Sequence, residues 1–406
     1  NAKVMPLNIR RAVLTRSGAQ HQLDLMLNLI NQPTQLEVVA QIEGDLAQPQ
    51  DLKIHSYIKL EHANFDDYFQ HYLIGDYAID GGNIDLTAWL DWQAGHLTKV
   101  QTQLDVDQLL LWSYTQGSAL ERLNIKSELL WKSPAVGEWD LSGANVLLGF
   151  DNAELDSVVS KFKLTRSPDA QQFVAETIDV AQVAKLLLYS GELSTAQHTM
   201  VRDLAPHGLI QNIKMDLEPD TWQLGLQFTQ LGFHSWNAVP GVKNLQGELL
   251  ATPNSGKIKI ASDETWIDYR MVFPQNFLFS EINGDVFWEY GGKFWQVSTE
   301  KLTFKNDDID LISHFLLKGG EGLDTHLDMA AETEHFDALN MHKYTPTGEL
   351  SKELSAWLKS SIGPGEIEHF DLQIAGPIKE FPTYDAGEGL FRMHLNVKDL
   401  ELGFDP

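Results

Sequence analysis

The sequence contains no cysteine. This absence excludes a disulfide framework, a thiolate nucleophile and any cysteine-ligated zinc or iron–sulfur site. Basic residues are also scarce, with 30 Lys and Arg against 57 Asp and Glu, so the formal net charge is −27. A chain this acidic is repelled by the phosphates of nucleic acids and by anionic bilayer surfaces. We therefore expect no nucleic-acid partner.

Long hydrophobic runs are missing as well. No stretch approaches the roughly 18 consecutive apolar residues that a membrane-spanning helix needs. The chain opens with Asn1-Ala2 and carries no secretory signal, so we interpret residues 1–2 as a cloning scar on a segment of a longer protein. Signatures such as G-x-S-x-G, the P-loop, G-x-G-x-x-G and H-E-x-x-H do not occur, and we expect no catalytic residue, cofactor or metal.

What the sequence does contain is period-two alternation, which is typical of strands with one apolar face. Residues 83–92 alternate apolar and mainly polar side chains, and residues 209–217, 222–228, 370–374 and 393–397 repeat the pattern. Glycine- and proline-containing turn signals separate these runs. The sequence therefore predicts many short antiparallel strands.

Three helices are predicted between the strands. Asn64 precedes an apolar stripe over 65–73, and Ser194 with Gln197 forms a capping-box pattern before a helix that ends near Pro206. A third stripe runs from Leu350 to Ile362. Each helix is followed by a strand.

This order of elements repeats along the chain. Residues 193–217 align with 350–374 at a spacing of 157, and a weaker copy begins near Asn64. We predict a tandem array of helix-plus-meander units. The predicted boundaries are an N-terminal segment over 3–178, a repeat unit over 179–335 and a second, truncated unit over 336–406.

Metal and acid–base sites have little support in the sequence. The run Asn306–Asp310 resembles the start of a calcium loop but lacks its glycine and its final glutamate, so we favour a solvated turn. The histidines, among them His335, His342 and His369, fit no ligand spacing. Asp66 and Asp67 are adjacent, which suits the first turn of a helix better than catalysis.

Eleven tryptophans are present, including Trp266, Trp288 and Trp295. They could pack in a core, stack on sugars or line a lipid channel. Three to five helices are too few to cover the apolar faces of so many strands. Either the sheet folds onto itself as a sandwich, or it curls into a trough with an exposed apolar wall, which implies a hydrophobic ligand.

Serially ordered weak motifs indicate a family. Val239 to Leu249, with Gly256 to Ile260, resembles the "PG … L-G-x-L … G-x-L-x-L" stretch of the YhdP branch of the AsmA-like proteins. Gly376 to Pro382 resembles that family's "G … FP" step, and Leu204 to Gly208 its helix stop. Lys343 to Pro346 departs from an expected Tyr-Leu-Pro-like step. The match is good over 175–406 and looser before it.

The resemblance implies an inner-membrane-anchored periplasmic protein of Gram-negative bacteria. It implies an elongated, strongly curved antiparallel β-groove that moves phospholipid between the inner and outer membranes and supports the outer-membrane barrier. The expected partners are phospholipid acyl chains, with membrane contact through other parts of the parent protein. No catalytic residue is carried over.

The alternating strands supply the candidate lining of such a groove. Strands of eight to ten residues extend about 27 to 33 Å, enough to curl around acyl chains. A β-sandwich scaffold that recognises glycan or protein, and a hydrolase with paired carboxylates, remain open alternatives. The candidate lipid-contacting residues are Ile84, Leu86, Leu90, Leu224, Leu226, Phe228, Phe370, Leu372, Met393, Leu395 and Val397.

Overall fold

The protein is described by a computed structural model. The structure describes residues 7–29, 33–65, 73–74, 77–113, 118–119, 122–135, 137–150, 154–190, 193–237, 239–346, 348, 352–381 and 389–403. It divides into two compact units, of which unit 1 comprises 1–198 and 212–220, and unit 2 comprises 199–211 and 221–406. The three-part division predicted from the repeats, at 178/179 and 335/336, stays a prediction.

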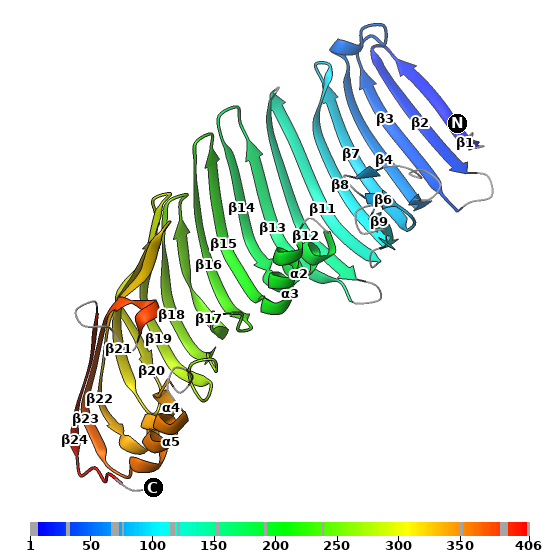
Figure 1. The fold of residues 1–406 in the computed structure, drawn as a ribbon. Coiled ribbons are helices and arrows are strands. Elements are labelled where there is room, and N and C mark those ends of the chain that lie inside the picture. The colour runs from blue at the N-terminus through cyan, green and yellow to red at the C-terminus, as the bar shows by residue number, and fades with distance from the viewer. Residues whose placement is uncertain are drawn as a thin grey trace. The chain divides into compact units, whose positions relative to one another are not determined.

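Unit 1 is built on an antiparallel sheet in which strands pair in the order β1-β2-β3-β4-β7-β8-β11-β12-β13-β14 (Figure 1). A small antiparallel sheet joins β5, β6, β9 and β10. The strands are β1 (Leu7–Ser17), β2 (Gln20–Leu29), β3 (Gln35–Glu43), β4 (Lys53–Asn64), β5 (Leu73–Ile74), β6 (Tyr77–Ile79), β7 (Asn83–Gln93), β8 (His96–Leu109), β9 (Leu111–Ser113), β10 (Ser118–Ala119), β11 (Leu123–Ala135), β12 (Glu138–Phe150), β13 (Asp156–Arg166) and β14 (Gln171–Asp179).

Unit 2 is also an antiparallel sheet, with each strand paired to the next from β16 to β24. The strands are β16 (Thr221–Phe233), β17 (Gly241–Ala251), β18 (Ser255–Asp268), β19 (Phe277–Tyr290), β20 (Phe294–Lys305), β21 (Asp310–Gly320), β22 (Leu323–Asp337), β23 (Glu366–Pro377) and β24 (Leu390–Lys398). Strand β15 (His207–Glu218) and helix α3 (Thr195–Leu204) contribute residues to both units. The expectation of a mainly antiparallel β fold with few short helices is confirmed.

The helices occur only between certain strands of the described chain. Helix α2 (Val180–Ser190) follows β14, and η2 (Ala338–Asn340), α4 (Met341–Tyr344) and α5 (Lys352–Ser361) lie between β22 and β23. Two single-turn 3₁₀ helices, η1 (Pro49–Asp51) and η3 (Ile378–Glu380), complete the set. In this described part of the chain, no helix is long and apolar enough to span a bilayer.

The predicted helices meet different outcomes. The capping box before α3 is present, because the Ser194 backbone N–H donates to Gln197 Oε1 at 3.0 Å and the Gln197 N–H donates back to Ser194 Oγ at 3.4 Å. The stripe over 350–362 corresponds to α5. The helix predicted over 65–73 falls mostly on 66–72, outside the described residues, and Leu73 belongs to a strand. Sequence periodicity did not predict α2 or α4.

Bulges bend the strands in both units. Several non-glycine residues at strand positions have φ of about +50° to +65°, in the left-handed region that non-glycine residues rarely adopt. Many of them coincide with register shifts, which mark β-bulges. These residues are His62, Gln108 and Asn145 in unit 1, and Gln230, Asn244, Glu264 and His335 in unit 2. Because a bulge adds a bend and increases twist, the strands curl rather than run straight.

Candidate hydrophobic binding face

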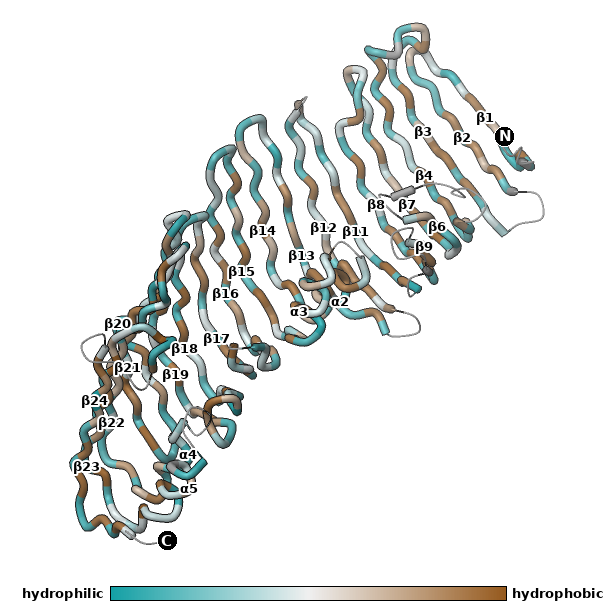
Figure 2. Tube along the Cα trace, in the orientation of Figure 1, coloured by the Kyte–Doolittle hydropathy of each residue, from teal (hydrophilic) through white to brown (hydrophobic). Residues whose placement is uncertain are grey.

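In unit 2 the strand register collects the apolar side chains on one face. Leu226 of β16 opposes Leu249 of β17, which opposes Ile258 of β18, which in turn opposes Val286 of β19. Apolar residues also oppose one another across β21 and β22, where Leu317 pairs with Leu327, and the pairing of apolar residues continues through β23 and β24. We call this surface the apolar face of unit 2. Figure 2 shows the brown and teal alternation along these strands.

The opposite surface, the polar face of unit 2, carries the intervening side chains. Lys257 and Asp285, on neighbouring strands, form an ion pair at 2.9 Å, and Lys318 lies 3.9 Å from Asp328. His369 contacts Glu334 at 2.7 Å on the same surface. These exposed pairs contribute little stability individually. They keep one side of the sheet wet and so fix which side is available to an apolar ligand.

Unit 1 has the same two-faced construction. Val38 of β3 opposes Ile58 of β4, which opposes Ala88 of β7, and Leu25 of β2 continues the row. The opposite face carries charged side chains such as Lys59 and Glu61, which form an ion pair with 2.7 Å between Lys59 Nζ and Glu61 Oε1. The apolar face of unit 1 is defined by the rows that contain these aliphatic residues.

Large aromatic side chains on the apolar faces lie against glycines of the neighbouring strand. Phe162 of β13 covers Gly143, and Phe228 of β16 covers Gly247, where an added Cβ would come within 2.7 Å of the Phe228 ring. The registers pair both combinations directly. A ring that lies over a glycine covers bare backbone with hydrocarbon. The apolar wall is therefore continuous across these strands.

At one end of the strands, short segments cover the apolar face of unit 2. Ala338 of η2 is buried with Phe277, Phe279 and Ile282 of β19, and Met341 and Tyr344 of α4 pack against this cluster. The Tyr344 ring stacks on Phe277 with centroids 5.1 Å apart. We call this end of the unit 2 strands the capped rim, because η2 and α4 cover it. We refer to η2 and α4 together as the cap of unit 2.

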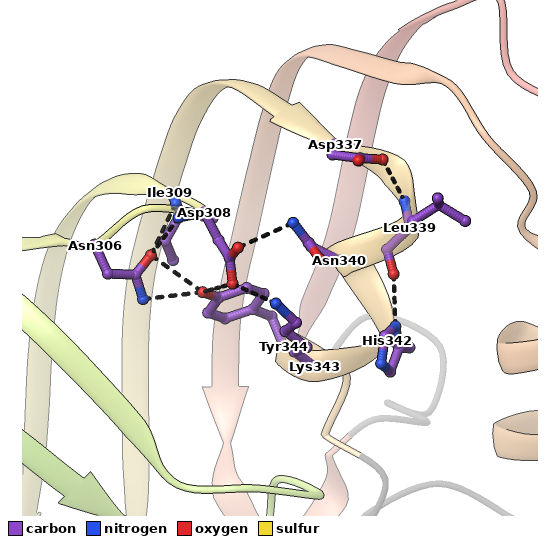
Figure 3. A network of polar contacts seen from close by, with 9 residues as sticks. All are labelled: Asn306, Asp308, Ile309, Asp337, Leu339, Asn340, His342, Lys343 and Tyr344. Atoms are coloured by element: carbon purple, nitrogen blue, oxygen red, sulfur yellow. Dashed lines mark hydrogen bonds and ion pairs between the residues drawn. The ribbon is translucent and has the colours of Figure 1, made fainter.

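A network of hydrogen bonds connects η2 and α4, the cap of unit 2, to the turn between β20 and β21 (Figure 3). Lys343 Nζ and Asn340 Nδ2 donate to the two Asp308 carboxylate oxygens at 2.8 and 3.0 Å, and the Tyr344 hydroxyl donates to Asp308 Oδ2 at 3.1 Å. Asn306 donates to the Tyr344 oxygen at 3.0 Å. Burial, opposed by the Asn306 hydrogen bond and reinforced by the Asp308 charge, raises the pKa of Tyr344 to about 12. These contacts hold α4 in place.

This network corrects the solvated-turn interpretation of 306–310. Asn306 Oδ1 accepts the Asp308 and Ile309 N–H groups at 2.9 and 3.0 Å, and the Asp308 carboxylate is engaged by α4. Asp308 is only partly exposed and Ile309 is buried. The turn is therefore an anchor point for a helix, with its oxygens already occupied.

In unit 1 the corresponding end is covered by two other elements. Ile79 of β6 and Leu111 of β9 pack on Val106 and Ile84, so the small sheet covers the ends of β7, β8 and β11. Helix α2 places Val183 and Leu186 against Leu148 of β12. Gln182 of α2 fixes the helix through its N–H, which donates to Asp179 Oδ1 at 3.0 Å. This end is the capped rim of unit 1.

In the described residues, the other end of the strands in each unit carries mainly tight hairpins, together with η1 between β3 and β4 and η3 after β23. The hairpins include β17–β18, β19–β20 and β21–β22 in unit 2, and β7–β8, β11–β12 and β13–β14 in unit 1. We call this end the hairpin rim. Within the described residues, no α-helix or second sheet belongs to a hydrophobic cluster at this end, where Phe381, next to η3, contacts the Phe391 ring of edge strand β24. Side chains there, such as Leu226 and Val286, remain partly exposed.

The structure places all of the candidate lining residues on the apolar faces. Ile84, Leu86 and Leu90 share the apolar face of unit 1. The remaining eight share the apolar face of unit 2, where Phe228 is buried and Met393 and Val397 on edge strand β24 are 46 % exposed. The sequence could not assign a face, whereas the register does. Their role in binding stays a prediction.

Several apolar-face residues were not singled out from the sequence. Ile258 and Val286 continue the row that begins with Leu226, and Leu317 continues the row of Trp288 through Val297. Their strands alternate less cleanly because bulges at positions such as Glu264 shift the period by one residue. The available signal was the alternation between Lys257, Ile258, Lys259 and Ile260.

Depressions of the surface lie among charged residues. One of about 470 Å³ in unit 1 is lined by side chains that include Lys59, Glu61, Asp105 and Lys126. The Asp105 carboxylate lies 2.8 Å from Lys126 Nζ and raises the pKa of that lysine through a hydrogen bond and its charge. These carboxylates are paired with lysines rather than with each other, unlike an acid–base pair of a hydrolase.

The candidate metal-binding histidines are dispersed. His335 contacts Glu366 at 3.0 Å, His369 contacts Glu334, and His342 contacts the Leu339 carbonyl oxygen at 2.6 Å. Within the described ranges, no group of three or more His, Asp or Glu side chains has an arrangement that could hold a metal ion. Asp66 and Asp67 lie outside the described residues.

Comparison with known proteins gives a single family. The model of the YhdP protein family matches residues 2–406, which is nearly the whole chain. No curated protein and no solved structure matches significantly. The family indicates a lipid-transport-like protein of the bacterial envelope, in keeping with the two apolar faces described above. The chain belongs to the YhdP family.

Proposed function

We propose that this chain is a non-enzymatic segment of a periplasmic lipid-transport protein. In this proposal the parent protein is anchored in the inner membrane of a Gram-negative bacterium. The apolar faces shield phospholipid acyl chains during transfer between the inner and outer membranes, while the headgroups stay in water. Such transfer supports the permeability barrier of the outer membrane.

One observation carries the proposal, namely that the apolar face of each unit is covered at the capped rim and uncovered toward the hairpin rim. Monomeric soluble proteins rarely leave a contiguous apolar surface of this kind without a ligand or partner. In unit 2, the rows of β16 to β19 that contain Leu224 and Leu226 consist of aliphatic, aromatic and glycine residues without an intervening charge. Acyl chains match that chemistry.

The energetics favour holding a lipid without selecting it closely. Each methylene removed from water contributes about 0.8 kcal/mol, so two acyl chains are retained strongly by contact area alone. Rows such as Leu226, Leu249, Ile258 and Val286 present nearly equivalent surfaces on consecutive strands. An acyl chain that moves from one strand to the next along such a row therefore exchanges similar contacts, which keeps the energy barriers to its movement low.

The test uses substitutions that place a charge on the apolar face. The 406-residue chain is incubated with vesicles of phosphatidylethanolamine and phosphatidylglycerol, separated from them, and examined by native mass spectrometry. Leu226→Glu and Met393→Glu, both in unit 2, are expected to reduce the retained phospholipid to the amount that the apolar face of unit 1 holds. Gln223→Glu, on the exposed polar face of the same strand as Leu226, is the matched control and should retain the full amount.

Met393 is 46 % exposed, so its substitution leaves the fold intact even if Leu226→Glu destabilises β16. Circular dichroism establishes that each variant is folded. A folded Met393→Glu variant and a folded Leu226→Glu variant that both retain lipid as the parent chain does would refute the assignment of these walls. A parent chain that retains no lipid, yet shows tryptophan fluorescence quenched by oligosaccharide, would favour a glycan-binding scaffold.

A further inference from the structure

Six of the eleven tryptophans lie in one structural position, at the hairpin rim and on an apolar face. Trp92 and Trp139 are one residue from the ends of β7 and β12, and Trp222 and Trp295 are the second residues of β16 and β20. The set, which we call the rim tryptophans, comprises Trp92, Trp131 and Trp139 in unit 1, and Trp222, Trp288 and Trp295 in unit 2.

The register assigns each of these indoles to the apolar side. Trp131 opposes Val100 on one neighbour and Leu141 on the other, and Trp288 opposes Val297. Trp139 and Trp222 precede the apolar-face residues Leu141 and Leu224 by two positions, which puts them on the same face. By contrast, Trp266 lies on the polar face, opposite Lys243.

Two of the rings rest on glycines that leave room for them. Gly256 of β18 lies beneath the Trp288 indole, and Gly319 of β21 beneath that of Trp295, where an added Cβ would come within 2.8 Å of Trp295 Cζ2. The two glycines are cross-strand partners of those tryptophans. The indoles are therefore held as platforms along the rim.

The rim tryptophans are half-covered. Trp92 is 36 % exposed, and the other five are partly buried. Indole combines a large apolar ring with an N–H donor, so it favours the boundary between hydrocarbon and hydrated headgroups. A row of indole rings beside exposed aliphatic side chains is therefore suited to contact the region where the acyl chains of a lipid join its hydrated headgroup. A sugar-binding platform would instead need exposed ring faces away from the aliphatic rows.

The opposite rim is suited to the ends of acyl chains. At the capped rim, Leu302 and Ile282 are buried in the same hydrophobic cluster as Ala338 of η2, and Met341 of α4 packs against that cluster. Trp295 lies seven residues from Leu302 on β20, a span of about 23 Å. One leaflet of bilayer hydrocarbon is about 15 Å thick, so acyl chains fit between them without displacing α4.

Resting on the proposed lipid-binding function, we propose that phospholipid lies along the strands in one orientation. The headgroup and ester region lie at the hairpin rim against the rim tryptophans, and the acyl chains run toward the capped rim. The rim tryptophans thus act as positioning residues that set the depth of the ester region. Each unit carries its own set.

Fluorescence quenching tests the orientation. The 406-residue chain is loaded with phosphatidylcholine that bears a nitroxide either on the headgroup or at the terminal carbon of an acyl chain. The headgroup label is expected to quench tryptophan fluorescence more strongly than the terminal label. The triple variant Trp222→Phe, Trp288→Phe and Trp295→Phe should lose about half of the headgroup-label quenching, because three of the six rim indoles are removed.

The control is Trp266→Phe, which removes an indole from the polar face and should leave headgroup-label quenching nearly unchanged. Phenylalanine preserves apolar area, so the triple variant is expected to retain lipid. Stronger quenching by the terminal label, or undiminished headgroup-label quenching in the triple variant, would overturn the orientation while leaving lipid binding intact. Failure of the parent chain to load either lipid would instead refute the proposed function on which the orientation rests.

Discussion

Asp308 illustrates how a single side chain decides the position of an element. Its carboxylate accepts hydrogen bonds from Lys343, Asn340 and Tyr344, all of which belong to η2 or α4. Helix α4 has only four residues, too few to be stable in isolation. Its place over Phe277 and Phe279 therefore depends on tertiary contacts, with Asp308 as the shared acceptor.

Replacement of Asp308 by Ala should destabilise unit 2. The change removes the acceptor of a partly buried ammonium group and of an amide, and one of the two acceptors of the Tyr344 hydroxyl, which costs roughly 2 to 3 kcal/mol. Urea denaturation, followed by circular dichroism, measures the loss. The neighbouring Asp307 is exposed, so Asp307→Ala should change the free energy of unfolding by less than about 0.5 kcal/mol. Equal effects of the two substitutions would argue against the anchoring role.

Tyr344 makes the same contact sensitive to alkaline pH. Its pKa is raised from 10.0 to about 12 in the folded protein, so the unfolded chain releases the phenolic proton first. The contribution of Tyr344 to stability is therefore complete below pH 10 and declines as the pH rises from 10 toward 12. Denaturation at pH 9 and pH 11 should reveal a loss that Tyr344→Phe lacks. An identical pH dependence in the two proteins would contradict the raised pKa.

At the scale of elements, bulges and caps determine which parts of each sheet are covered. Buried polar contacts secure the bulge between β17 and β18, where Ser262 Oγ and Thr265 Oγ1 lie 2.6 Å apart, so that one hydroxyl donates to the other. The two oxygens lie 3.1 and 3.3 Å from the Asn244 carbonyl oxygen, which accepts from the remaining hydroxyl. The bend lets short segments reach the strand ends. Covered and uncovered zones of one face thus come from local irregularities in otherwise regular strands.

The capping box of α3 gives a measurable element-scale effect. Ser194→Ala removes the side-chain acceptor for the Gln197 N–H and the hydroxyl that donates to Gln197 Oε1. We expect a loss of about 1 kcal/mol in the free energy of unfolding. Ser194→Asp retains an N-terminal acceptor and should restore most of it. Urea titration distinguishes the two variants. Equal loss in both would show that the cap does not act through its acceptor.

At the scale of the whole molecule, charge and apolar surface are sorted onto different faces. The net charge of −27 opposes self-association of a chain that displays an apolar face in each unit. Lysines on the polar faces are paired with carboxylates in several rows. The excess of acid therefore acts against contact between the apolar faces of different molecules.

The uncovered apolar faces predict that the folded chain binds the dye 8-anilinonaphthalene-1-sulfonate at neutral pH. Most folded domains bind this dye weakly, because their apolar surface is packed. Here its fluorescence should rise without loss of the circular-dichroism signal of the strands, and short-chain phosphatidylcholine should reverse the rise. A folded chain that leaves the dye fluorescence unchanged would show that the faces are already covered.

The sequence alone determined the elements that depend on local physics. Alternation over 83–92 and 370–374 was sufficient to predict β7 and β23. Successive side chains of a strand point to opposite faces, so an apolar residue at every second position places all apolar side chains on one face only in a strand. Ser194 and Gln197 fixed the start of α3 for the same local reason. The serial motifs near Val239 to Leu249 led to the family that the whole-chain match confirms.

Only the tertiary structure decided what covers the strands. No apolar periodicity in the sequence predicts helix α4. It is held in place because Lys343 and Tyr344 donate hydrogen bonds to Asp308, which lies 35 and 36 residues away in sequence. The placement of three tryptophans at the hairpin rim of each unit likewise follows from strand pairing and not from spacing. Long-range register and packing determine which side chains share a face, and no window of consecutive residues contains that information.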